Sequence, residues 1–353
     1  MSKALDRRDF LRAALVGAAG ALYAVPPSGC TGNDTRTSCN RQVGDAHETG
    51  VFSLCLDGSG TLFTSGGADG TIKLWRLPEG ALLGTVAASS APLGALALAP
   101  AGNLVASAGE DGTIRLWNPL DGTEVTRWTA HAAAITALAF SSDGQLLVSA
   151  SADATLKLWR AFDGSLVATL AGHTLGVLSM AMNPTGTLLA SSSEDGTVRL
   201  WSMPDGGVLG VIPMEAGPAA SLALGADGAL MATGGRDGTV RLWNILDGTE
   251  TQTLKWHTGA VTSVVISPDQ TVIASASVDE TINLWRAGNG ARLATLEDHA
   301  GAVNALVVGP DSKLLVSASS DRSIRLWRLP HGRYMASASD PALPVRTVVS
   351  FSC

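Results

Sequence analysis

A seven-residue sequence of the form Asp-Gly-Thr-Ile-Arg-Leu-Trp recurs at a constant interval of 42 residues, and it constrains the fold more than any other feature. No residue is inserted or deleted between the first and the last copy. A fixed period of this length is typical of an array in which one small unit of secondary structure stacks against its neighbours. The seven copies are Asp69–Trp75, Asp111–Trp117, Asp153–Trp159, Asp195–Trp201, Asp237–Trp243, Asp279–Trp285 and Asp321–Trp327.

One copy of the repeat contains four short segments separated by turn residues. They are Ala134–Phe140, Gln145–Ser149, Thr155–Arg160 and Leu166–Leu170. Such segments predict one four-stranded antiparallel sheet for each repeat. The composition agrees, because glycine supplies 40 of the 353 residues and charged residues only 16%. We therefore predict an all-β protein, a seven-bladed β-propeller of four-stranded antiparallel blades that bury their faces against each other.

A histidine, a hydroxyl residue, the turn aspartate and the tryptophan share the 42-residue register, and here the sequence resembles the WD-repeat family over residues 45–339. The resemblance implies that these four groups form a hydrogen-bonded chain within each blade. Ser89 and Glu215 replace the histidine in the second and fifth blades, which we expect to be the least stable,. The Trp-Asp dipeptide that names the family is absent. The histidines are His47, His131, His173, His257 and His299, and the hydroxyl residues are Ser65, Ser107, Ser149, Ser191, Thr233, Ser275 and Ser317.

A ring of metal ligands or a set of catalytic dyads is the alternative interpretation of these histidines and aspartates. Structural groups recur in every repeat, whereas active sites rarely do. The sequence has no GxSxG or HExxH motif, and its four cysteines show no CxxC spacing,. We therefore predict a scaffold for protein–protein interaction that is not an enzyme and that holds no metal and no cofactor. Two alternatives stay open: a periplasmic enzyme or electron-transfer subunit with a cofactor in the propeller channel, and an amplified repeat array without a dedicated partner.

The resemblance also implies that partners contact one face of the propeller. This face is formed by the third and fifth residues after each histidine and by the residue before each turn aspartate. Trp256, which directly precedes His257, is a further candidate, with packing flat against a neighbouring blade as the alternative,. The net charge of −7 argues against nucleic acid, so we expect a protein or peptide partner and a monomeric propeller,. The candidate partner-binding residues are Phe52, Glu110, Leu178, Glu194, Arg236, Trp256 and Asn304.

Residues 1–29 have the pattern of an export signal. Arg7 and Arg8 begin the sequence RRDFLR, and an uncharged, mildly apolar segment, Ala13–Val25, follows. This segment is too short to span a bilayer. The sequence resembles twin-arginine signals, which implies a bacterial protein that is exported in the folded state to the periplasm or the cell envelope.

The end of the signal has two interpretations. Cys30 follows a sequence that resembles the end of a lipoprotein signal, which implies that this cysteine carries a lipid and that membrane contact occurs only through this anchor,. Cleavage near Ala24 is the alternative. Residues 30–44 are polar and lack an apolar period, so they predict a linker,.

The last blade requires a closing strand. Tyr334–Ala338 fits the position of a fourth strand better than the polar segment before residue 45 does, and we predict that it closes the seventh blade. Residues 340–353 form a tail, within which Val345–Phe351 resembles the first strand of a partial eighth repeat and is expected outside the ring. A disulfide between Cys39 and Cys353 is expected to join the ends of an exported chain.

Overall fold

The structure is a computed structural model, and it describes residues 41–43, 46–89 and 92–339 of the chain. All the regular secondary structure in these ranges is β-strand. Within the same ranges no helix is long and apolar enough to cross a membrane. The predicted export signal, the lipid-bearing Cys30, the disulfide between Cys39 and Cys353 and the partial eighth repeat lie outside the described residues.

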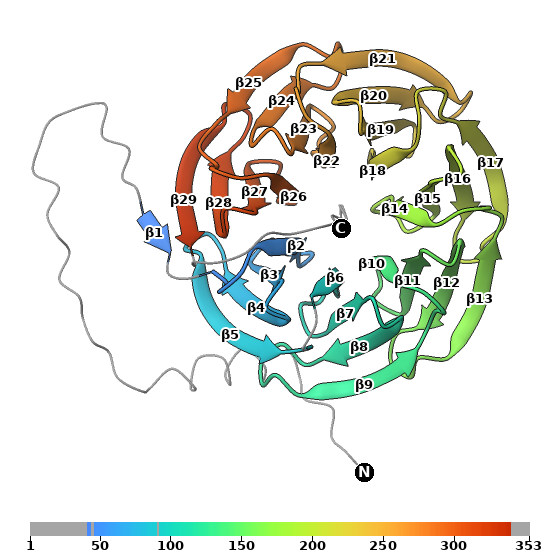
Figure 1. The fold of residues 1–353 in the computed structure, drawn as a ribbon, viewed down its shortest axis with the longest axis vertical. Helices are drawn as coiled ribbons and strands as arrows, with labels where there is room; N and C mark the ends of the chain where they lie inside the picture. Colours follow the sequence, from blue (N-terminus) through green and yellow to red (C-terminus); the bar gives the residue numbers. More distant parts are fainter. Residues whose placement is uncertain (1–40, 44–45, 90–91, 340–353) are drawn as a thin grey trace, which may run out of the picture. The chain divides into compact units, whose positions relative to one another are not determined.

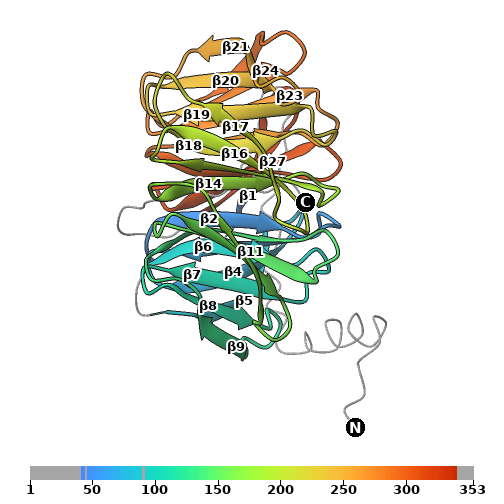
Figure 2. The same ribbon diagram turned by 90° about the vertical axis from the view of Figure 1, so that its right-hand side faces the viewer.

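Seven antiparallel sheets stand around a common axis, as Figure 1 shows. Four strands that are consecutive in the sequence make each blade, with the first strand nearest the axis and the fourth at the rim. In the perpendicular view successive sheets lie stacked on each other (Figure 2). The prediction of a seven-bladed β-propeller with a 42-residue repeat is confirmed. The third strand expected from the sequence of blade 3, Thr155–Arg160, has the same bounds in the structure.

The strands of each blade follow the period of the sequence closely. Blades 1 to 3 consist of β2 (Val51–Leu56), β3 (Leu62–Gly67), β4 (Thr71–Arg76) and β5 (Ala81–Ala87); β6 (Leu93–Leu98), β7 (Val105–Gly109), β8 (Thr113–Trp117) and β9 (Glu124–Thr129); and β10 (Ile135–Phe140), β11 (Leu146–Ser151), β12 (Thr155–Arg160) and β13 (Leu166–Ala171). Blades 4 and 5 consist of β14 (Val177–Met182), β15 (Leu188–Ser193), β16 (Thr197–Ser202) and β17 (Val208–Pro213); and β18 (Ala219–Leu224), β19 (Leu230–Gly235), β20 (Thr239–Asn244) and β21 (Thr249–Lys255). Blades 6 and 7 consist of β22 (Val261–Ile266), β23 (Val272–Ser277), β24 (Ile282–Arg286) and β25 (Arg292–Leu296); and β26 (Val303–Val308), β27 (Leu314–Ser319), β28 (Ser323–Arg328) and β29 (Arg333–Ser339).

The hydrophobic core is divided among the junctions between neighbouring blades. Each junction holds one cluster of buried apolar residues, and each cluster contains the tryptophan of the later blade; for example, Trp201 of blade 4 packs with Leu156 and Leu158 of blade 3. The seven tryptophans are between 1% and 7% exposed. The tryptophan of each blade is therefore buried by the blade before it, and the stability of a blade depends on its neighbour. The tryptophans are Trp75, Trp117, Trp159, Trp201, Trp243, Trp285 and Trp327.

The seventh blade is closed by its own fourth strand. β29 pairs antiparallel with β28, at the position that the sequence predicts. One further strand was not predicted: β1 (Arg41–Val43), at the end of the expected linker, pairs parallel with β29 and makes this sheet five-stranded. An edge strand offers backbone donors and acceptors to any extended segment, so the polar character of residues 41–43 does not prevent this pairing.

Each innermost strand contains a bulge near its start. In blade 3 the register with β11 shifts between Ile135 and Ala137, and the other six blades shift at the same place. A bulge turns the side chain of its extra residue away from the ladder. Thr136 accordingly donates its hydroxyl to the carbonyl of Val177 in blade 4, at 2.9 Å. Asn304 donates in the same way to the carbonyl of Val51, at 3.4 Å, and this bond joins blade 7 to blade 1.

Candidate functional site

A chain of hydrogen bonds crosses each blade that has a histidine. In blade 3 the indole N–H of Trp159 donates to Ser149 Oγ at 2.8 Å, Ser149 Oγ lies 2.7 Å from His131 Nε2, and His131 Nδ1 lies 2.8 Å from Asp153 Oδ2. Blades 1, 4, 6 and 7 have the same chain; there the histidine Nε2 lies between 2.7 and 2.8 Å from the hydroxyl oxygen. The structure therefore brings together the histidines, hydroxyl residues, aspartates and tryptophans that the sequence places in one register.

Local sequence positions these four groups. Trp159 and Leu147 are partners across the ladder of β11 and β12, and Ser149 lies two residues further along β11, on the same face of the sheet,. Asp153 lies in the turn between β11 and β12, where its carboxylate accepts the backbone N–H of Thr155 at 3.0 Å and that of Ala132 at 3.3 Å. The carboxylate thus fastens the loop that carries His131 to the turn of the same blade.

The protonation states follow from burial. Burial lowers the pKa of His131, His173 and His299, so these imidazoles are neutral at pH 7,. Burial raises the pKa of Asp195, but hydrogen bonds from Thr197, Thr174 and His173 outweigh it and lower the pKa to about 2. In the neutral imidazole one nitrogen donates and the other accepts. Nδ1–H therefore donates to the carboxylate, and Nε2 accepts the hydroxyl hydrogen.

The two blades without a histidine use arginine instead. Arg115 Nη2 lies 2.7 Å from Asp111 Oδ2 in blade 2, and Arg241 Nη2 lies 2.6 Å from Asp237 Oδ2 in blade 5. Burial raises the pKa of Asp237, but hydrogen bonds from Arg241 and Thr239 lower it to about 2. Both arginines stand two positions before the tryptophan of their blade. Each binds a turn carboxylate that has no imidazole beside it.

Two of the candidate partner-binding residues are buried. Phe52 and Asn304 are each 4% exposed. Both occupy the bulge of an innermost strand, and Asn304 donates hydrogen bonds to Val51 O and to Ser320 Oγ. The prediction that these two residues are surface anchors is therefore wrong. The bulge directs this position toward the neighbouring blade, which a count of residues from the histidine does not reveal.

The other candidates reach the surface to different degrees. Leu178 is half-buried, whereas Glu110, Glu194 and Arg236 are exposed. Arg236 Nη2 lies 3.9 Å from Glu194 Oε1, so a loose ion pair connects blade 5 to blade 4 on this face. Val278, 48% exposed, occupies a position that the sequence assigns to this face, whereas Leu175, 51% exposed, lies outside the predicted positions.

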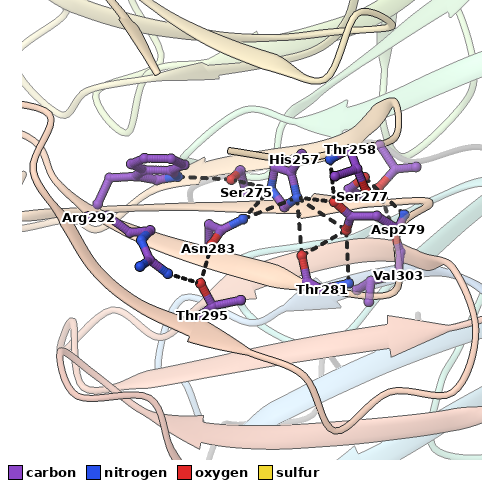
Figure 3. A network of polar contacts seen from close by, with 12 residues as sticks. His257, Thr258, Ser275, Ser277, Asp279, Thr281, Asn283, Arg292, Thr295 and Val303 are labelled. Carbon is purple, nitrogen blue, oxygen red and sulfur yellow. Dashed lines mark hydrogen bonds and ion pairs between the residues drawn. The ribbon is translucent and has the colours of Figure 1, made fainter. Parts of the chain in front are cut away.

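Trp256 is exposed, and a guanidinium group stacks on its ring. It is 55% exposed, and the guanidinium carbon of Arg292 lies 3.7 Å from the centre of its ring,. Arg292 Nη1 donates to Thr295 Oγ1, whose hydroxyl donates in turn to Asn283 Oδ1 at 2.6 Å. Asn283 Nδ2 lies 3.2 Å from His257 Nε2. Figure 3 shows Arg292, Thr295, Asn283 and His257 in this network. An exposed aromatic–cation pair is thereby connected to the buried hydrogen-bond chain of blade 6.

Within the described ranges no three histidine, cysteine, aspartate or glutamate side chains are placed to hold a metal ion. A pocket of about 160 Å³ lies among the ends of the innermost strands of blades 1 to 4, where Leu56, Leu98, Phe140 and Met182 contribute to its lining. These side chains are apolar, so the pocket offers few polar groups to orient a ligand.

Comparison with known families agrees with this geometry. The family described as WD domain, G-beta repeat, matches most of the chain, at residues 38–76, 80–118, 122–160, 164–202, 215–244, 248–286 and 290–328. The chain belongs to the WD-repeat family. The fifth match of this WD-repeat protein begins at residue 215, where the spacing of the other matches would place its start at 206. No curated protein matches the chain.

Removal of a buried histidine is expected to destabilise the propeller strongly. His131→Ala leaves the hydroxyl hydrogen of Ser149 without an acceptor, removes one donor from Asp153 and opens a cavity, so we expect the free energy of unfolding to fall by about 2–4 kcal/mol,. Glu215→Ala removes an exposed side chain at the same position of blade 5 and is the matched control, expected within about 0.5 kcal/mol of the wild type,. Urea denaturation followed by circular dichroism measures both; equal values for the two variants would contradict the role of the histidine.

Stability is expected to fall with decreasing pH in two steps. The folded-state pKa of His131, His173 and His299 lies below 6.5, so the unfolded chain binds protons that the folded chain excludes once the pH falls below 6.5,. The aspartates add a second loss as the pH falls from 3.8 toward 2. Urea midpoints measured from pH 8 to pH 3 should stay level above 7 and then decline. His131→Asn should reduce the slope of the first step, whereas a midpoint that rises between pH 7 and 5 would exclude this explanation.

Proposed function

We propose that this WD-repeat protein is a non-catalytic scaffold that binds a protein partner on the turn face of blades 4–6. Propellers of this family generally serve as platforms for protein interaction, and the chain has the uniform blades of such a platform. We use the term turn face for the side of the propeller on which the turns between second and third strands and the loops into the first strands lie. On blades 4–6 it exposes Leu175, Glu194, Arg236, Trp256 and Val278.

The composition of this surface supports the proposal. Leu175, Trp256 and Val278 are large apolar residues of this face, and each is between 48% and 55% exposed. Glu194 and Arg236 are 51% and 63% exposed along their side chains and carry opposite charges. Large apolar side chains exposed on the same face as charged groups are a feature of interaction surfaces.

Trp256 is the observation that carries the proposal. Tryptophan and arginine are enriched among the residues that contribute most to binding energy. Arg292 stacks on the ring at 3.7 Å and is fixed through Thr295, so the indole loses little conformational freedom when a partner covers it,. A ring that is preorganised and more than half exposed is available for contact with a second protein.

Substitution of the exposed tryptophan is expected to weaken partner binding. Trp256→Ala should reduce the affinity for a partner recovered from envelope extracts by about thirtyfold, as for a residue that contributes about 2 kcal/mol. Leu246→Ala is the matched control, because Leu246 is 84% exposed but lies in the turn between β20 and β21, on the opposite side of the sheet from the turn face. Affinity is measured by surface plasmon resonance with the purified partner. If both variants bind like the wild type, Trp256 is not an anchor.

We also propose that the protein acts in the bacterial cell envelope. The support is the sequence RRDFLR and the uncharged segment after it, which resemble a twin-arginine signal. Replacing Arg7 and Arg8 by lysine should retain the protein in the cytoplasm, as measured by cell fractionation and immunoblotting. Cys30→Ser distinguishes the two forms, since it releases a lipid-anchored protein from the membrane fraction and leaves a soluble periplasmic protein where it was. Unchanged export of the double-lysine variant would reject the twin-arginine route.

A further inference from the structure

A pocket of about 360 Å³ lies at the junction of blades 4 and 5. Its walls come from the end of β17 and the loop after it, from β19, from β20 and from the start of β21. The side chains that its chemistry depends on are Glu215, Thr233, Arg241, Trp243 and Glu250. The volume lies at the lower end of the range for small-molecule sites, about 300–1,000 Å³.

The pocket lies where other blades place an imidazole. In blade 4 the ring of His173 fills the space between Ser191 Oγ, at 2.8 Å, and Asp195 Oδ2, at 2.9 Å. Blade 5 keeps the hydroxyl, the aspartate and the tryptophan at the matching positions, but the residue in place of the histidine is Glu215, whose side chain is exposed. The rest of the imidazole site is therefore present, and the ring itself is missing.

The floor of the pocket has a hydroxyl that lacks one hydrogen-bond partner. Thr233 is 3% exposed, and its oxygen accepts the indole N–H of Trp243 at 2.9 Å. Among the described residues the structure gives the Thr233 hydroxyl hydrogen no acceptor. In the five complete blades that hydrogen goes to the histidine Nε2. A buried donor without an acceptor costs free energy, so a ligand nitrogen that accepts this hydrogen is favoured.

Acceptors for an N–H group are present as well. Glu250 Oε2 lies 3.7 Å from Arg241 Nε, and Arg241 also holds Asp237, so carboxylate oxygens lie beside the pocket. The position two before the turn aspartate is Gly235, where a Cβ atom would lie 2.3 Å from Asp237 Oδ1. Blades 3, 4, 6 and 7 have serine at this position, whereas in blade 5 the carboxylate of Asp237 lies against the glycine and thus close to the pocket wall. The serines are Ser151, Ser193, Ser277 and Ser319.

We propose that the blade-5 pocket binds a neutral imidazole group supplied from outside the blade. One ring nitrogen accepts the hydroxyl hydrogen of Thr233, and the N–H on the other side of the ring donates to the carboxylates near Arg241. The indole of Trp243, which is 7% exposed, lies along the wall and contacts the ring. A small imidazole compound and the histidine side chain of a peptide both offer this chemistry.

The first experiment is an NMR titration of the full chain at pH 8, where imidazole is neutral. The indole N–H of Trp243 donates to Thr233, so its resonance reports directly on the pocket. Imidazole, with five non-hydrogen atoms, should shift this resonance saturably with a Kd of about 1–10 mM. The resonance is assigned with Trp243→Phe. The indole of Trp159, whose blade already contains His131, is the internal control and should not move.

Two variants test the assignment of the site. Glu215→His supplies the missing ring from within the chain and should abolish the shift of the Trp243 resonance. Thr233→Val keeps the shape but removes the hydroxyl donor, and we expect it to weaken imidazole binding at least tenfold. Because the second variant does not depend on the new histidine entering the pocket, the two are independent. Retention of wild-type binding by Thr233→Val would overturn the proposal, as would a wild-type resonance that never shifts.

The source of the imidazole is decided by a parallel titration with two blocked tripeptides, Gly-His-Gly and Gly-Ala-Gly. A shift of the Trp243 resonance with the first peptide alone supports docking of a partner's histidine. A shift with imidazole but with neither peptide supports a small-molecule site. A shift that is equal for both peptides shows that the ring is not what binds, and it overturns the proposal. The result is independent of the proposed scaffold function, since Trp256 lies outside the pocket.

Discussion

The burial of one indole at each blade junction is the constraint from which the remaining polar architecture follows. Packing a tryptophan between two sheets removes its N–H group from water, and a buried donor requires an acceptor. The acceptor is a hydroxyl oxygen on the neighbouring strand, and the hydrogen of this hydroxyl needs an acceptor in turn. The imidazole Nε2 accepts that hydrogen, and the imidazole Nδ1–H donates to the turn carboxylate. The carboxylate also accepts backbone N–H groups, so no buried donor of this chain is left without an acceptor. Each blade thus repeats one solution to a problem created by hydrophobic packing.

The histidine is the member of this series that the fold can replace. In blades 2 and 5 the indole still donates to its hydroxyl, at 2.8 and 2.9 Å, and an arginine from the third strand neutralises the turn aspartate. The arginine satisfies the carboxylate but leaves the hydroxyl of Thr233 with one partner fewer. A blade can therefore keep its place in the ring while losing an internal group, and the loss leaves a space lined by polar atoms. New binding chemistry can arise in this way without an inserted loop.

The sequence determined the fold almost completely, because its period is constant and every turn carries its own residues. Strand bounds such as Thr155–Arg160 and the closing role of β29 could be predicted directly from the sequence. The exposure of individual side chains on the surface could not be predicted as well. Phe52 and Asn304 were misplaced because a bulge rotates them inward, and bulges leave no signature in the letters alone. The pairing of Arg241 with Asp237 could not be predicted either. Arginine occupies the same position in blades 4 and 7, where the histidine is present, so the residue type alone does not indicate this pairing.

The bulge residues also make the junctions, or seams, between neighbouring blades unequal. Thr136 and Asn304 each donate a side-chain hydrogen bond to a backbone carbonyl of the next blade, and Thr262 does the same between blades 6 and 7. At the corresponding place in blade 4 stands Leu178, whose hydrocarbon side chain has no hydrogen to give. The bulge residues of blades 1, 2 and 5, which are Phe52, Gly94 and Ala220, also have no side-chain hydrogen to donate, so four of the seven seams lack this bond, and the seam that contains the pocket is one of the four. The ring is thus fastened unevenly, and local opening is expected at these four seams before the three seams that have the bond.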